Sequence, residues 1–175
     1  MKNKIKPIQF KSKVDVLPYF EGLHYLEVPV KVVKHFGGKF RVRLLCTLTP
    51  KIKIHCGLMA LGGGKGYITL NKKILKSASI KKGSKIDVKL ELDHSEFGMP
   101  LSEELTEVLS QDSQAYDRFI KLTPGKQRNI IHFVASVKNS EKRIDRAIKI
   151  LENLKRCEPG KETIQKLLGY RTNDF

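Results

Sequence analysis

Two cysteines and two histidines are candidates for redox or metal chemistry. Cys46 and Cys56 lie ten residues apart, on two alternating segments joined by a short turn, so their side chains are expected on one inward face. Such thiols form a redox pair, or bind a metal with His35 or His55. Metal sites usually pair their ligands at Cys-x-x-Cys spacing, which is absent here. Buried thiols acting as small hydrophobic groups are therefore the favoured interpretation.

A glycine-rich segment at residues 62–66, Gly-Gly-Gly-Lys-Gly, offers backbone amides and the Lys65 ammonium group to a phosphate. The phosphate-binding loop of nucleotide hydrolases needs Gly-x-x-x-x-Gly-Lys-Ser/Thr at the start of a helix. Here residues 67–70 have the pattern of a strand, so a hairpin connection is the favoured interpretation.

Catalytic constellations are not evident. The five histidines share no spacing typical of a catalytic or ligand set, and no Ser, Cys or Asp has an identifiable general base near it in sequence. We therefore predict a nonenzymatic protein with no catalytic residues, no metal and no cofactor.

Basic residues are the remaining candidates. The chain has 34 Lys and Arg against 18 Asp and Glu, a formal charge of +16. Residues 1–98 hold twenty basic and seven acidic residues, whereas residues 99–175 hold fourteen and eleven. This excess attracts polyanions. Nucleic acid, a membrane surface and solubility alone are the open explanations.

The last predicted long helix carries a basic stripe. Lys142, Arg146, Lys149 and Arg156 recur at steps of four, three and seven residues, which places them on one face. A solvated face is the commoner use of such a run, and contact with phosphates is the alternative. On the predicted strands, outward positions offer Lys, Arg, Thr and His rather than aromatic rings. That composition favours duplex or nonspecific contact over single-strand binding.

The first half of the chain contains segments in which apolar and polar residues alternate, a pattern typical of strands. Residues 39–48, 52–60 and 85–93 alternate apolar and polar side chains, and 8–16, 23–28 and 66–70 do so more weakly. Two short helices are expected at 30–36 and 71–79. About six short strands separated by turns indicate an antiparallel barrel or curled sheet.

After Pro100 the pattern becomes helical. Ser102, Asp112, Thr123 and Ser140 are predicted N-caps. The last long helix is predicted to bury one face and to end at residues 158–160, before a short segment at 162–168; its predicted buried residues are Ile144, Ala147, Ile148, Leu151 and Leu154.

Composition indicates a compartment. Three cysteines, an odd number, favour a reducing environment. No apolar run approaches the roughly 20 residues that span a bilayer, and the basic N-terminus leads into alternating residues rather than a signal sequence. We expect a cytoplasmic protein with no membrane span.

Two stretches resemble known families. Residues 100–146 resemble the YdeI/OmpD-associated, or bacteriocin-protection, family, whose Ser-Ala-Lys and Thr-Arg-x-x-Arg steps match Ser136, Lys138, Arg143 and Arg146; Val137 and Lys142 replace the usual Ala and Thr. Residues 66–73 and 80–93 are similar to the small β-barrel domain of unknown function often fused to it. This barrel resembles the split, AbrB/antitoxin-like barrels of DNA-binding regulators, which implies a fold but transfers no activity.

The sequence therefore predicts an α+β protein: an N-terminal antiparallel split β-barrel at 1–96 and a small C-terminal helical bundle at 97–175. The expected function is binding of nucleic acid or another polyanion, and the alternative is a protein-interaction or stress- and bacteriocin-protection module; the oligomeric state stays open. The candidate anion contacts are Arg41, Arg43, Lys51, Lys53, Lys138, Lys142, Arg143, Arg146 and Lys149.

Overall fold

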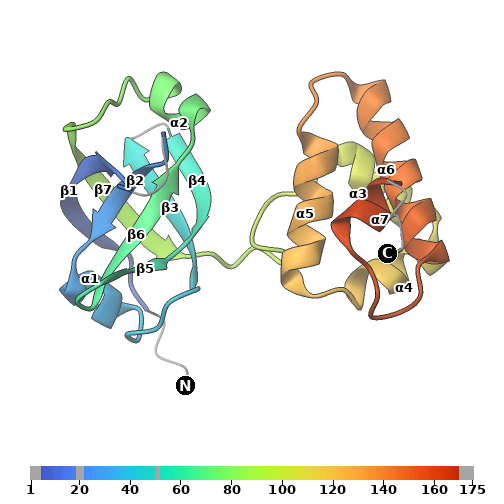
Figure 1. Cartoon of the computed structure of the whole chain (residues 1–175), viewed down its shortest axis with the longest axis horizontal. Helices are drawn as coiled ribbons and strands as arrows, with labels where there is room; N and C mark the ends of the chain where they lie inside the picture. The colour runs from blue at the N-terminus through green and yellow to red at the C-terminus, as the bar shows by residue number, and fades with distance from the viewer. Residues whose placement is uncertain (1–4, 19–21, 50–51, 170–175) are drawn as a thin grey trace. The chain divides into compact units, whose positions relative to one another are not determined.

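A computed structural model describes residues 5–18, 22–49 and 52–169 of the chain. The chain divides into two compact units, Met1–His94 and Ser95–Phe175. The first unit contains the strands and the second contains the longer helices (Figure 1). The predicted α+β class, an antiparallel curled sheet followed by a helical region, is confirmed.

Seven strands make up the described sheet, and every neighbouring pair is antiparallel. The strand order is β4-β3-β7-β1-β2-β6-β5. Strands β4 and β5, at the two ends of this order, are separated in sequence by Leu58 alone. The sheet therefore curls until its two edge strands are joined through this residue (Figure 1). The strands are β1 Ile8–Val16, β2 His24–Val28, β3 Arg43–Thr49, β4 Ile52–Gly57, β5 Met59–Gly62, β6 Lys65–Leu70 and β7 Lys85–Leu92.

The concave face of the sheet forms the core of the first unit. Alternate side chains of each strand point inward and are buried, as the period of two requires. The fully buried members include Val14, Leu26, Leu44, Ile68 and Leu90. Two short helices complete the unit: α1, Val30–His35, and α2, Lys72–Ser77, whose N-cap Asn71 accepts a hydrogen bond from the Ile74 amide.

The strands predicted at 39–48 and 52–60 both differ from the structure where residues 41–42 contact Leu58. The strand predicted at 52–60 is broken at Leu58, whose amide donates to the Val42 carbonyl and whose carbonyl accepts from the Arg41 amide. Arg41 has a positive φ of 64°, so β3 begins only at Arg43 rather than at residue 39. The break at Leu58 divides one predicted strand into β4 and β5.

The glycine-rich segment forms the β5–β6 hairpin turn, as predicted. Gly62 pairs with Lys65, and the two intervening residues, Gly63 and Gly64, have positive φ of 55° and 75°. A two-residue turn with both central φ positive suits the twist of a hairpin and favours glycine at both positions.

The second unit contains five described helices. They are α3 Glu103–Gln111, α4 Ser113–Ile120, α5 Pro124–Ala135, α6 Ser140–Arg156 and α7 Ile164–Leu168. The predicted caps Ser102, Asp112 and Thr123 accept hydrogen bonds from the first turns of α3, α4 and α5. The cap of α6 is Asn139 rather than Ser140, because the Asn139 side chain accepts from the Lys142 amide at 2.8 Å.

Helix α6 is the centre of the second unit and packs against α3, α4, α5 and α7. Its buried stripe consists of Ala147, Ile150, Leu151 and Leu154. The prediction that Ile144 and Ile148 are buried is wrong: they are 40% and 47% exposed. The four helices that pack against α6 cover the face that contains Ala147 and Ile150, and Ile144 and Ile148 lie at the edge of that face. None of the helices in the described ranges is long and apolar enough to cross a membrane.

Candidate functional site

The cysteine pair is enclosed in the core of the sheet. Cys46 and Cys56 are buried free thiols on β3 and β4, offset by two positions in the strand register. The hydrogen bond that the Cys46 thiol donates to Cys56 and burial both raise the pKa of Cys46, so it remains protonated. His55 points to the opposite face, with Nδ1 2.8 Å from Asp93 Oδ2. In the described ranges, no three His, Cys, Asp or Glu residues gather as a metal site.

The barrel candidates do not form one continuous row. Arg41 is exposed in the turn before β3, and Arg43 is half-buried opposite Gly57 of β4. Lys53 is exposed and lies opposite Thr47, four residues further along β3, or about 13 Å from Arg43. Lys51 lies outside the described residues.

A denser group of lysines lies beside the end of β1. Lys13 and Lys85 are directly opposite each other on β1 and β7, and both are exposed. The turn between α2 and β7 (Figure 1) is fixed to β1 because the Gly83 amide donates to Val14, and the Val14 amide donates to Ser84. We call the exposed residues gathered there the lysine cluster: Lys13, Lys81, Lys82 and Lys85.

The described residues of the lysine cluster form one ion pair. Lys82 Nζ lies 3.8 Å from Asp15 Oδ1. Among the described residues, no carboxylate comes within 4.0 Å of the ammonium groups of Lys13, Lys81 or Lys85. Like charges directly opposite on neighbouring strands repel each other, so the Lys13–Lys85 pair destabilises the bare sheet slightly. A bound anion would remove that repulsion.

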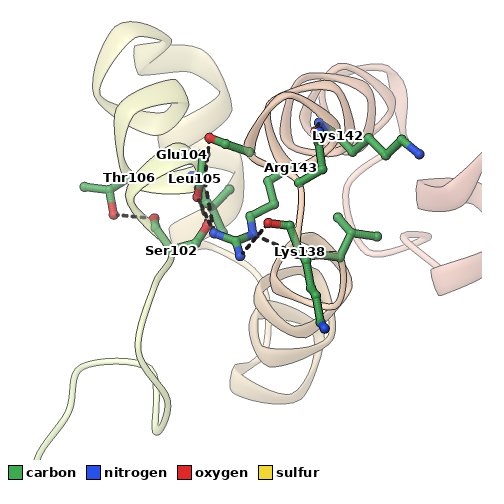
Figure 2. A network of polar contacts seen from close by, with 10 residues as sticks. Ser102, Glu104, Leu105, Thr106, Lys138, Lys142 and Arg143 are labelled. Atoms are coloured by element: carbon green, nitrogen blue, oxygen red, sulfur yellow. Dashed lines mark hydrogen bonds and ion pairs between the residues drawn. The ribbon is translucent and has the colours of Figure 1, made fainter.

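Arg143 fixes the start of α6 instead of facing solvent. Its Nη1 lies 3.1 Å from Glu104 Oε1, and its Nε and Nη2 donate to the carbonyls of Val137 and Lys138 (Figure 2). The pKa of Glu104 is lowered by hydrogen bonds from the Glu104 backbone amide and from the Ser140 hydroxyl, and by the nearby charge of Arg143. Arg143 therefore connects α3 with the loop before α6.

Arg146 has a similar internal role. Its Nη1 donates to the Phe133 carbonyl at 2.9 Å and to Ser136 Oγ at 2.7 Å, and its guanidinium lies 4.5 Å from the centre of the Phe133 ring. Ser136 also donates to Phe133, at the end of α5. The predicted basic stripe is thus partly covered by α5.

The other three helical candidates, Lys138, Lys142 and Lys149, are exposed. The side chains of Lys138 and Lys142 extend away from the Arg143–Glu104 pair and from each other (Figure 2). The structure therefore separates the five candidates of the second unit into two internal arginines and three surface lysines.

A buried carboxylate in the second unit was missed by the sequence analysis. Glu162 lies 3.0 Å from Lys126 and 3.3 Å from Arg118, and accepts a hydrogen bond from the Gly160 amide. These groups line a pocket of about 430 Å³ together with Lys121, Leu122, Thr123 and Pro159. Lys126 and Arg118 are 36 and 44 residues away from Glu162 in sequence, so no local sequence pattern predicts these contacts.

Replacement Glu162→Gln is expected to lower the free energy of unfolding at pH 7 by about 2 kcal/mol, because two cations lose their carboxylate. Bonding to Lys126 lowers the pKa of Glu162 from 4.5 to about 2. A lowered folded-state pKa gives stability that is present above about pH 4.5 and is lost as the pH falls towards 2. Urea unfolding from pH 7 to pH 2 should show the two curves converging in acid. The exposed Glu158→Gln is the matched control and should change little.

Outward aromatic rings are present on strands that the sequence predicted only weakly. Tyr25 of β2 and Tyr67 of β6 alternate with the buried Leu26 and Ile68, so both rings lie on the outer face. The expectation that outward positions lack aromatic groups is therefore wrong for this part of the sheet.

One pocket of about 670 Å³ opens between β1, β7 and β3. Its polar lining consists of Gln9, Lys11, Thr47, Asp87 and Lys89, and its other walls are apolar. No Ser, Cys or His side chain lines it. It offers no pairing of such a nucleophile with an imidazole base.

These features define a two-unit α+β protein whose curled sheet displays a group of exposed lysines and whose helical unit uses Arg118, Arg143 and Arg146 for internal contacts. Residues 10–90 match the family model described as a domain of unknown function (DUF1905), and residues 99–156 match the one described as bacteriocin-protection, YdeI or OmpD-associated (OmdA). The N-terminal part of the chain is thus similar to DUF1905 domains and the part after it to the YdeI/OmpD-associated family, which confirms the resemblance stated above. A search of curated proteins finds no match.

Proposed function

We propose that this protein is a nonenzymatic nucleic-acid-binding protein that holds the phosphate backbone on the lysine cluster of its N-terminal unit. The observation that carries the proposal is the direct opposition of Lys13 and Lys85, beside Lys81 and Lys82, with one neighbouring carboxylate paired to the group. Lysine ammonium groups neutralise phosphates without reading sequence. Its three free thiols favour a reducing compartment such as the cytoplasm.

The cluster suits a backbone better than a small anion. Lys13 and Lys85 come from neighbouring strands, and Lys81 and Lys82 come from the turn bound to β1, so the ammonium groups spread over a convex surface. Successive phosphates of one strand are several ångströms apart and engage spread charges one by one. Arg41 and Lys53, at other positions of the same unit, then add long-range attraction rather than direct contact.

Fluorescence anisotropy of a labelled 20-nucleotide DNA, titrated with the full chain, tests the proposal. Binding is expected at about 50 mM salt and should weaken at least tenfold by about 200 mM, because released counterions oppose binding as salt rises. Absence of binding at the lower salt would contradict the proposal.

A second candidate function is protein recognition by the helical unit. Ile144 and Ile148 form an exposed apolar pair on α6, and such surface pairs suit a protein partner. In that case the lysines only keep the protein soluble, and the same titration shows no retention of DNA at low salt.

A further inference from the structure

An aromatic pair interrupts the outer face of the first unit. The rings of Tyr25 and Tyr67 pack edge to face, with centroids 5.9 Å apart and planes at 77°. Met59 of β5 lies directly opposite Tyr67 and is 39% exposed. The two rings, on β2 and β6, and Met59, on the adjoining strand β5, form an apolar area on the outer face. We call Tyr25, Tyr67 and Met59 the tyrosine platform.

The two carboxylates next to the tyrosine platform, Asp15 and Glu27, both form ion pairs with lysines. Tyr25 is directly opposite Asp15 on β1, and Asp15 is paired with Lys82. Glu27, the outward carboxylate of β2, lies 2.9 Å from Lys65. Burial and these two carboxylates raise the pKa of Tyr25, so its phenol stays neutral. A polyanion therefore meets no unpaired carboxylate among the described residues beside the rings.

The platform adjoins the lysine cluster across a single strand. Lys13 and Asp15 lie on the same face of β1, two residues or about 7 Å apart. The Asp15 carboxylate forms an ion pair with Lys82, and Asp15 lies directly opposite Tyr25 in the register of β1 and β2. A chain that passes from Lys85 and Lys13 towards β5 thus leaves the lysines and reaches the two rings within about two strand widths. Positive charge followed by stacking surface is the arrangement typical of single-strand binding.

We infer that the ligand is single-stranded nucleic acid, with its phosphates on the lysine cluster and its unpaired bases on Tyr25 and Tyr67. The inference rests on the proposed function and names its substrate class. A duplex keeps its bases stacked inside and presents only phosphates, sugars and base edges, so it gains nothing from the rings. A single strand offers base faces, which stack on aromatic side chains whatever the sequence.

The test compares a labelled thymidine 20-mer with a duplex of equal length, using the full chain. The double variant Tyr25→Leu with Tyr67→Leu should lose roughly tenfold to a hundredfold in single-strand affinity, since a base loses its stacking partner. Duplex affinity and the salt dependence of both complexes should not change, because the lysines are intact. The double variant Tyr25→Phe with Tyr67→Phe keeps both rings and should bind as the wild type does.

Two controls separate the possible failures. Tyr116→Leu removes an exposed tyrosine from α4 of the other unit and should leave single-strand affinity unchanged. Far-UV circular dichroism shows whether the leucine variant is folded, and the single variants Tyr25→Leu and Tyr67→Leu, each expected to lose part of the single-strand affinity, supply the reading if it is not. Salt-sensitive binding of the wild type with equal affinity in all tyrosine variants would overturn this inference alone. Absence of wild-type binding to either DNA would overturn the proposed function as well.

Discussion

Replacing Lys13, Lys81 and Lys85 together by glutamine is expected to weaken single-stranded DNA binding on the order of a hundredfold at low salt. Each ammonium–phosphate contact in water contributes roughly 1 kcal/mol, so three contacts give about this factor. Lys82 is left in place because it pairs with Asp15 beside the tyrosine platform. Anisotropy titration of the labelled 20-mer measures the effect. The variant should fold normally, since the replacement removes a like-charge pair from β1 and β7.

The matched control removes the same charge from the other unit. Lys138, Lys142 and Lys149 are exposed and were candidates from the sequence, and their replacement by glutamine also lowers the net charge by three. If the lysine cluster holds the backbone, this variant should bind within about threefold of the wild type, since only long-range attraction is reduced. Equal losses in the two variants would show that total charge, rather than the cluster, governs binding.

Arg146→Ala is expected to lower the free energy of unfolding of the helical unit by about 2 kcal/mol. The change removes the hydrogen bonds of a charged group to the Phe133 carbonyl and Ser136, together with the contact over the Phe133 ring. Urea unfolding followed by circular dichroism at 222 nm measures it, because the longer helices belong to this unit.

The neighbouring exposed residue is the control for Arg146. Lys149→Ala lies one helical turn further along α6, and a surface substitution of this kind should change stability by no more than about 0.5 kcal/mol. DNA affinity should be unchanged in Arg146→Ala under conditions where the protein is folded. A loss of DNA affinity with unchanged stability would instead make Arg146 an anion contact.

Much of the fold follows from local patterns in the sequence. Alternation placed β1 and β7 with errors of no more than one residue at either end, and the caps Ser102, Asp112 and Thr123 begin three helices as predicted. These features depend on neighbouring residues, which a sequence displays directly. Positive φ at Arg41 and the break at Leu58 depend on hydrogen bonds between separate segments, and the pattern did not reveal them.

The candidate site was less predictable because its meaning depends on pairing between distant segments. The lysines of the cluster are visible in the sequence, yet the opposition of Lys13 and Lys85 arises only from the register of β1 and β7. Likewise, the family motif made Arg143 a candidate anion contact, but its guanidinium instead pairs with Glu104, 39 residues earlier. Tyr25 and Tyr67 were missed because their strands were the weakly alternating ones, for which outward faces were not assigned.

The excess of basic residues is therefore resolved into groups with different roles. Arg143 and Arg146 hold α3, α5 and α6 together, and Glu162 is held by Arg118 and Lys126. The lysine cluster remains exposed and next to aromatic rings. That separation is the basis of the proposed function.

The slope of log affinity against log salt concentration tests this account most directly, because it counts the phosphates that the protein neutralises. It should be measured side by side for the wild type and for the variant with Lys13, Lys81 and Lys85 replaced by glutamine. Each single-strand contact contributes about 0.7 to the slope, so the variant should be shallower by about 2. Equal slopes for the two proteins would contradict the assignment of the phosphate backbone to the lysine cluster.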